Sequence, residues 1–137
     1  MGLISLPGGV YYAASKHALE GYFKALRFEL AEFNIKVSMV EPVGFKTNIV
    51  TNSKVAENKI GDYDAYRTKL AAYTENLFSN SEEPRAVVEK LLQLVENKNP
   101  SFNHPVGKGS SLFPAIQYLS FKTFEKSVIK DINKFRK

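Results

Sequence analysis

Apolar residues recur at spacings of three and four along residues 12–33, a stretch that contains no proline. They are Leu19, Phe23, Leu26, Leu30 and Phe33, and most of the charged residues fall off this line. On a helix this spacing places the apolar side chains on one face, so the pattern predicts a long amphipathic helix over 12–33. Before it, Pro7, Gly8 and Gly9 predict a turn.

A short β-rich segment follows the predicted helix. Asn34 is a plausible helix terminator, and residues 35–41 then read as a strand that Pro42 closes. The order helix, tight turn, strand is half of a βαβ unit, so the sequence predicts a parallel sheet.

Two further helices are predicted in the middle of the chain, after a loop at 43–61. Helical spacing of apolar residues extends over 63–78. A second helix is expected over 83–96, with Ser81 or a polar neighbour as its cap and Pro84 in its first turn.

The last forty residues carry a weaker pattern. Residues 100–106 could form a second short strand, in which Pro105 would confine pairing to an edge or an end. Within the tail at 107–137, residues 112–121 are apolar and residues 123–137 are amphipathic, which predicts additional C-terminal helices.

Composition indicates one folded domain of modest size. The chain has 137 residues, of which 44% are hydrophobic and 24% charged. It contains no cysteine, and His17 and His104 are far apart, so neither a disulfide framework nor a metal site is expected. No apolar run is long enough to span a bilayer and the first residues lack a signal-peptide pattern, so a cytoplasmic protein is the default expectation.

Tyr12 and Lys16 form the pair with the clearest chemical potential. Four residues apart on a helix, they project from the same face within one turn. An ammonium beside a phenol favours the phenolate, so such a tyrosine can exchange a proton with an alcohol or carbonyl oxygen. Tyr11 points about 100° away from this face and is expected to be a packing residue.

The segment around this pair resembles a known active site. Residues 11–21 are similar to the active-site helix of the short-chain dehydrogenase/reductase family, in which Tyr-x-Ala-Ser-Lys-x-Ala opens a long helix. Residues 25–30 resemble the continuation of that helix, and 35–42 resemble the family's next strand. The resemblance implies an α/β fold, namely the C-terminal half of a doubly wound, Rossmann-like parallel sheet. It also implies a nicotinamide cofactor, NAD or NADP, whose ribose Lys16 would bind while Tyr12 exchanges the proton.

The resemblance extends past the strand to a turn that meets the nicotinamide. The family has Pro-Gly, three variable residues and Thr there, and this chain has Pro42, Val43, Gly44, Phe45, Lys46 and Thr47. Pro42 and Thr47 keep the spacing, while Gly44 lies one place later than the family's glycine and is the residue suited to a positive φ. Pro42, Gly44, Phe45 and Thr47 are therefore expected beside the cofactor.

Two parts of the family pattern are missing. The family's catalytic serine precedes the tyrosine by about a dozen residues, a position before Met1, and Ser5 is too close to Tyr12 to replace it. The glycine-rich turn that seats the pyrophosphate is also absent, because neither Gly8-Gly9 nor the glycines at 107 and 109 are expected between a strand and a helix. The chain is thus expected to be the C-terminal part of such an enzyme, and its apolar helix and strand faces lack a partner.

The region corresponding to the family's substrate loop, residues 43–80, is rich in aromatic side chains. They are Tyr63, Tyr66, Tyr73 and Phe78. By resemblance to the steroid and retinol dehydrogenase branch, they suggest a lipophilic alcohol or carbonyl substrate, although core packing would explain the same residues. The family commonly pairs the helix equivalent to 12–33 between subunits, which implies a homo-oligomer for a complete protein.

Two alternatives stay open. The chain could be a truncated, catalytically incompetent fragment that acts at most as a protein-interaction piece through its apolar helix face. The formal charge of +5 and a basic C-terminus also allow a membrane-surface or nucleic-acid-binding module. The basic residues of the C-terminus are not accompanied by a recognisable nucleic-acid-binding motif or by interleaved aromatic residues. Nucleic acid is therefore not an expected partner.

Overall fold

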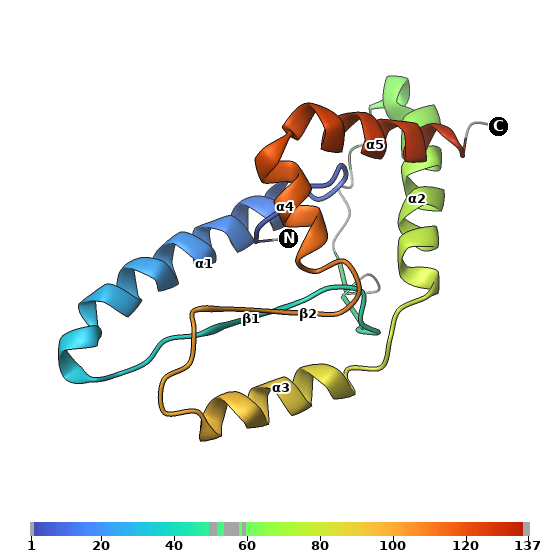
Figure 1. Cartoon of the computed structure of the whole chain (residues 1–137). Helices are drawn as coiled ribbons and strands as arrows, with labels where there is room; N and C mark the ends of the chain where they lie inside the picture. Colours follow the sequence, from blue (N-terminus) through green and yellow to red (C-terminus); the bar gives the residue numbers. More distant parts are fainter. Residues whose placement is uncertain (1, 50–51, 54–57, 59, 136–137) are drawn as a thin grey trace.

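The computed structural model describes residues 2–49, 52–53, 58 and 60–135. Helices dominate, and two short strands lie between them (Figure 1). In chain order the elements are α1 (Val10–Glu29), η1 (Ala31–Phe33), β1 (Met39–Pro42), η2 (Gly61–Tyr63), α2 (Asp64–Ser79), α3 (Arg85–Glu96), β2 (Asn103–Val106), α4 (Leu112–Leu119) and α5 (Phe121–Asn133).

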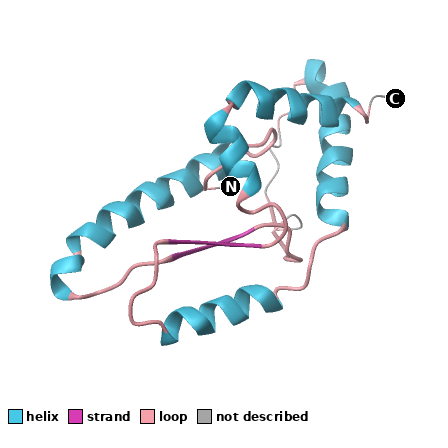
Figure 2. Cartoon of the chain, viewed as in Figure 1, coloured by secondary structure: helices cyan, strands magenta, loops and turns pink. Residues whose placement is uncertain are grey.

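The two strands pair in parallel, in a register that runs from Met39 opposite Asn103 to Pro42 opposite Val106. Helix α1 and helix α3 lie on opposite sides of this strand pair (Figure 2). The chain therefore has the α/β architecture and the parallel pairing that the helix–turn–strand order predicted. Helices on both sides of a parallel sheet are typical of doubly wound folds, and this arrangement is consistent with part of one.

Prolines occupy both outer edges of the strand pair. The amide of Met39 donates to Phe102 O and the amide of Val43 donates to Val106 O. Because backbone groups alternate in direction along a parallel strand, Pro42 of β1 and Pro105 of β2 face away from the partner strand. Pro105 thus lies at an edge, as its missing amide proton required.

Helix α1 begins and ends earlier than its apolar spacing predicted. It starts at Val10, just after the turn at Pro7–Gly9, and it ends at Glu29. A 3₁₀ turn, η1, then continues to Asn34, whose φ of 58° makes it the left-handed terminator that was expected.

The predicted strand over 35–41 is formed only at Met39–Pro42. Residues before Met39 have no strand beside them, because β2 begins at Asn103. Arg27 of α1 holds them instead: its guanidinium donates to Val37 O and, at 2.9 Å, to Pro100 O. The Arg27 side chain thereby links the segments that lead into the two strands to helix α1.

Helix α3 begins at Arg85 rather than at 83, and its N-cap is Pro84, not Ser81. The residues before it pair with the segment that follows β1. The amide of Glu82 donates to Gly44 O at 2.8 Å, and the amide of Lys46 donates to Glu82 O at 2.9 Å. Because both backbone groups of Glu82 are used in this pairing, Glu82 is not part of helix α3.

Of the two C-terminal helices, α5 packs on α2 and α4 packs on α5. Helix α2 matches the prediction for 63–78 to within one residue at each end, and α5 crosses it. Their contact contains the buried side chains Tyr73, Phe124 and Ile132. Pro114 is the third residue of α4, a position at which a helix has no use for an amide proton.

Large apolar side chains remain exposed over much of the molecule. In α1 only Ala13 and Glu20 are buried, and the apolar line of this helix is incompletely covered, as expected for a face that lacks a partner. Tyr11, predicted to pack, is 92% exposed. Two strands are too narrow to cover the facing helices, which is the physical reason for this exposure. Among the described residues, no helix is long and apolar enough to cross a membrane.

Candidate active site

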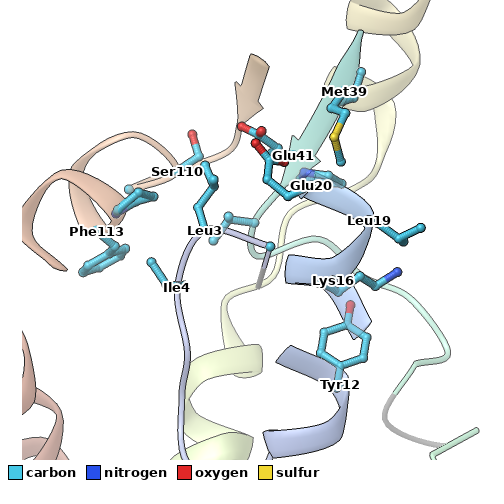
Figure 3. A pocket seen from close by; sticks show the side chains of 16 residues that line it. Leu3, Ile4, Tyr12, Lys16, Leu19, Glu20, Met39, Glu41, Ser110 and Phe113 are labelled. Carbon is cyan, nitrogen blue, oxygen red and sulfur yellow. The ribbon is translucent and has the colours of Figure 1, made fainter. Parts of the chain in front are cut away.

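A cavity of about 310 Å³ lies between α1 and β1 (Figure 3). Side chains of α1 line one side and the whole of β1 lines the other. The N-terminal segment and the turn that leads into α4 complete it. Its lining residues are Gly2, Leu3, Ile4, Tyr12, Lys16, Leu19, Glu20, Met39, Val40, Glu41, Pro42, Val43, Gly109, Ser110, Phe113 and Pro114.

Tyr12 and Lys16 lie side by side in this cavity, on successive turns of α1 (Figure 3). The Lys16 ammonium lies over the Tyr12 ring, 5.4 Å from its centroid. Tyr12 is 37% exposed, so its phenol is accessible from the cavity. The four-residue spacing has thus placed a cation against a phenol at the edge of a mostly apolar space, as the helical geometry predicted.

Of the other four residues expected beside a cofactor, the structure places only Pro42 on this cavity. Gly44 has a φ of 76°, the left-handed conformation expected of it, but it lies outside the cavity lining. Phe45 is buried and pairs with Glu82. Thr47 also lies outside the lining, and its hydroxyl accepts a hydrogen bond from the amide of Ile49 at 3.4 Å.

Val43 takes the lining position next to Pro42 instead. Its carbonyl lies so close to Gly107 that a Cβ on Gly107 would come within 2.2 Å of the oxygen. Gly107 has a φ of 102°, a conformation for which glycine is suited. The exits of β1 and β2 are therefore in close backbone contact at one end of the cavity.

The glycines at 107 and 109 lie between β2 and α4, so the sequence-based statement that no strand and helix flank them is wrong. The sequence indicates the strand only weakly, because Pro105 restricts its pairing. The turn does not have the shape of a phosphate cradle, however. The Phe113 ring covers Gly109, since a Cβ there would meet a ring carbon at 2.4 Å, and Lys108 pairs with Glu82 at 3.0 Å.

The N-terminal segment that lines the cavity is held by Gln117 of α4. The amide of Ser5 donates to Gln117 Oε1 at 3.2 Å, and Gln117 Nε2 donates to Leu3 O at 3.4 Å. Ser5 itself lines a second, separate cavity together with Tyr66 and α5. It is thus not positioned to replace the family's catalytic serine.

Three polar residues that sequence reasoning missed lie in or beside the cavity. Glu20 of α1 and Glu41 of β1 line it, and the Asn103 side-chain amide donates to both carboxylates, to Glu20 Oε1 at 3.0 Å. Burial raises the pKa of Glu41 above its ordinary value; the hydrogen bond from Asn103 opposes this and the nearby Glu20 adds to it.

Part of this polar arrangement could have been recognised from the sequence. Tyr12, Lys16, Glu20 and Lys24 follow one another at intervals of four, so they share one face of α1. Asn103 is 83 residues from Glu20, and only the fold brings the two together.

Both histidines bond to oxygen atoms of their own segments. His17 Nδ1 lies 2.9 Å from Ala13 O of its own helix, and His104 contacts Ser101. In the part of the chain that the structure describes, no three His, Cys, Asp or Glu side chains come together as metal ligands would.

Comparison with known proteins identifies a relationship over the segment that carries Tyr12 and Lys16. Residues 1–58 match the family described as short chain dehydrogenase. The chain is 32% identical over 116 residues to an uncharacterized oxidoreductase of Bacillus subtilis, YusZ, covering 81% of this chain and 41% of that protein. It is 32% identical over 124 residues to a 3-ketodihydrosphingosine reductase of Bacteroides thetaiotaomicron, covering 89% of this chain and 44% of the relative.

A third relative matches only the first part of the chain. Rat retinol dehydrogenase 7 is 43% identical over 58 residues, which are 42% of this chain and 18% of that protein. The chain spans less than half the length of these relatives.

Proposed function

From its homology to short-chain dehydrogenases, we propose that this chain carries the proton-transfer half of an NAD(P)-dependent oxidoreductase active site. The complete enzyme would interconvert an alcohol and a carbonyl compound. Tyr12 would exchange the proton, and Lys16 would stabilise the phenolate and bind the nicotinamide ribose.

One observation carries this proposal: the Lys16 ammonium lies 5.4 Å from the centre of the Tyr12 ring, and both side chains line one cavity. In the reducing direction, a bound cofactor would supply the hydride to the carbonyl carbon, and the Tyr12 hydroxyl would donate the proton to its oxygen. In the oxidising direction, Tyr12 accepts the proton of the alcohol. A nearby cation stabilises the charge that the phenol bears when its proton has left.

The residues present fit the nicotinamide–ribose end of such a cofactor. Lys16 forms no ion pair with a carboxylate in the described part of the chain, so its ammonium is available to a ribose hydroxyl. Pro42 and Val43 would border the ring at the exit of β1. The turn before α4 is covered by Phe113 and offers no comparable support for phosphates. The choice between NAD and NADP therefore rests on contacts that these residues do not make.

A lipophilic substrate is the class that we propose. Much of the cavity lining is apolar, contributed by Leu3, Ile4, Met39, Val40 and Phe113. The Bacteroides and rat relatives carry names that refer to a long-chain ketone and to retinol, both lipophilic compounds. Apolar lining with few polar groups is typical of pockets for such ligands.

The direct test is a titration of the chain with NADH and with NADPH, followed by the fluorescence of the reduced nicotinamide. Saturable binding that Lys16→Met weakens, while Lys36→Met does not, would support the proposal. Lys36 is a matched control, because it is an exposed lysine outside the cavity. Saturable binding that is unchanged in Lys16→Met would contradict the role given to Lys16.

The second candidate function is that of a protein-interaction piece without activity. The exposed apolar side chains favour it, notably those on α3: Val88, Leu91, Leu92 and Val95. Under this alternative the same titration shows no saturable binding of either cofactor, and the chain associates with other proteins through this helix.

A further inference from the structure

A line of lysines extends along α5, on the side of the helix opposite its packed face. They recur every four residues and are all exposed: Lys122, Lys126, Lys130 and Lys134. At 3.6 residues per turn, these positions lie roughly opposite Phe124 and Ile132, the buried side chains of the helix. With a rise of about 1.5 Å per residue, the lysine line is about 18 Å long. Helix α5 therefore presents an extended basic surface.

Most of the charge on this surface is not neutralised. Lys134 pairs with Asp131 at 2.6 Å, whereas the other three lysines form no ion pair within the described part of the chain. The remaining acidic residue of α5 is Glu125, which lies off the lysine line and lines the second cavity. On α5 and its C-cap, four lysines thus accompany two carboxylates, and this excess of positive charge favours an anionic partner.

Uncovered apolar side chains lie at the corner where α4 leads into α5, next to the first of these lysines (Figure 1). Tyr118 is 92% exposed, Leu119 81% and Phe121 62%. Tyr118 and Leu119 end α4, and Phe121 begins α5 after the single residue Ser120. Aromatic and apolar side chains next to lysines are typical of surfaces that lie in a membrane interface.

The second cavity, of about 230 Å³, lies beside this corner. Apolar residues of α5 line it together with Tyr66 of α2 and Pro7. Two of its lining residues, Phe121 and Ile129, are more than half exposed, so the cavity has an apolar rim at the surface. Ile129 is three residues from Lys126, a spacing that places the two side chains next to each other on the helix. The basic and apolar parts of the surface are therefore continuous.

We propose that α5 and the corner between α4 and α5 form a docking surface for a membrane that contains anionic phospholipids. The three unpaired lysines contact the headgroups, and Tyr118, Leu119 and Phe121 enter the boundary between headgroups and acyl chains. A nucleic acid would also attract the lysines, but it offers the side chain of Leu119 no apolar environment. This inference does not rest on the proposed function, because none of these residues lines the cavity that contains Tyr12.

The experiment is flotation of the full chain with lipid vesicles in a density gradient, in which vesicle-bound protein rises and self-associated protein does not. The vesicles are phosphatidylcholine with about 30% phosphatidylglycerol, and pure phosphatidylcholine is the reference. We expect the chain to float with the anionic vesicles, and less so as the ionic strength rises, because salt screens the lysines. Lys122→Gln combined with Lys126→Gln should weaken partitioning about 25-fold, roughly fivefold for each lysine.

Lys36→Gln combined with Lys98→Gln is the matched control, because it removes the same charge from two exposed lysines. They belong to the segments that lead into β1 and β2, at the opposite end of the molecule from α5 (Figure 1). This control should keep the affinity for anionic vesicles.

The apolar part of the surface has its own variant. Tyr118→Ser combined with Leu119→Ser should weaken partitioning about tenfold, because two side chains no longer leave water for the interface. Phe28→Ser combined with Phe33→Ser is the control, since both phenylalanines are similarly exposed but lie at and beyond the end of α1. Circular dichroism verifies that each variant folds.

Three outcomes would overturn the inference. Equal flotation with both kinds of vesicle would show that apolar surface adheres in general. Unchanged affinity in the lysine variant would exclude the lysine line from the contact. Binding of a DNA duplex without binding of anionic vesicles would identify the lysines as a nucleic-acid surface. The cofactor titration is independent, because the variants of α4 and α5 should leave the binding of NADH unchanged.

Discussion

Tyr12 and Lys16 illustrate what sequence predicts best at the scale of single residues. Their spacing of four predicted their common face, and the resemblance to a dehydrogenase helix is the source of the roles that we propose for them. The acidic pair was not predictable in this way, because Glu20, Glu41 and Asn103 come from three elements. Their meeting depends on the register of β1 against β2, in which Asn103 lies opposite Met39.

Replacing Tyr12 by Phe removes the proton that we assign to the reaction but leaves the ring beneath Lys16. Under the proposed function, we expect hydride transfer to slow by about 10²- to 10⁴-fold, the usual effect of losing a general acid or base. Cofactor affinity should change little, because Lys16 remains. Stopped-flow measurement of nicotinamide absorbance checks the rate. Tyr11→Phe is the control, since Tyr11 is exposed outside the cavity, and an equal loss of rate there would contradict the assignment.

Glu41 should make the stability of the fold depend on pH. Burial raises its pKa in the folded state above the ordinary value of 4.5, against the hydrogen bond from Asn103 and with the help of Glu20. The folded state then holds a proton that the unfolded state has lost. The contribution of Glu41 is therefore present below its ordinary pKa and is lost as the pH rises through the raised value.

We expect Glu41→Gln to remove this part of the pH dependence. The measurement is the free energy of unfolding in urea across a series of mildly acidic pH values, for both proteins. Parallel profiles of the two proteins would show that Glu41 titrates as it does in the unfolded chain.

At the scale of elements, local periodicity predicted the helices better than the strands. Helix α2 agreed within a residue, because its pattern and its ends are local properties. Strand β1 was shorter than predicted and α3 began later, because both limits depend on backbone partners distant in sequence. Those partners are Asn103 for the start of β1 and Gly44 for Glu82, which precedes α3.

Gly107 connects the two strand exits and should not tolerate a side chain. A Cβ there would meet Val43 O at 2.2 Å, and the φ of 102° disfavours any other residue. We expect Gly107→Ala to lower the free energy of unfolding by about 1–3 kcal/mol, the combined effect of strain and close contact. Gly61→Ala is the control, because nothing lies within 4 Å of its added methyl group and its φ is not positive. Urea unfolding monitored by circular dichroism compares the two, and an equal effect would contradict the role of Gly107.

At the scale of the whole molecule, exposed apolar surface is the dominant feature. Val95 of α3 is 86% exposed and Phe28 of α1 is 80% exposed. Monomeric proteins rarely leave so many large apolar side chains uncovered, which indicates that these helices pack against other surfaces. We propose that a homo-oligomer provides part of that cover.

The isolated chain should therefore self-associate at micromolar concentration through its helices. We expect Leu92→Lys combined with Val95→Lys to shift the chain towards the monomer, because two charges on α3 oppose its burial. Light scattering coupled to size-exclusion chromatography gives the mass of each form. Replacing the exposed Glu89 and Gln93 of the same helix by lysine is the control, and the same shift there would indicate charge repulsion alone.

The prolines at the outer edges of the strand pair limit the kinds of assembly that can form through the exposed apolar surface. Pro42 faces outward from β1 and Pro105 faces outward from β2. Neither edge therefore offers an unbroken row of amide protons to an additional strand. Growth by stacking extended segments, as in an amyloid fibril, is obstructed at both ends of the sheet. Clusters of this chain should remain helical in character and dissolve again on dilution.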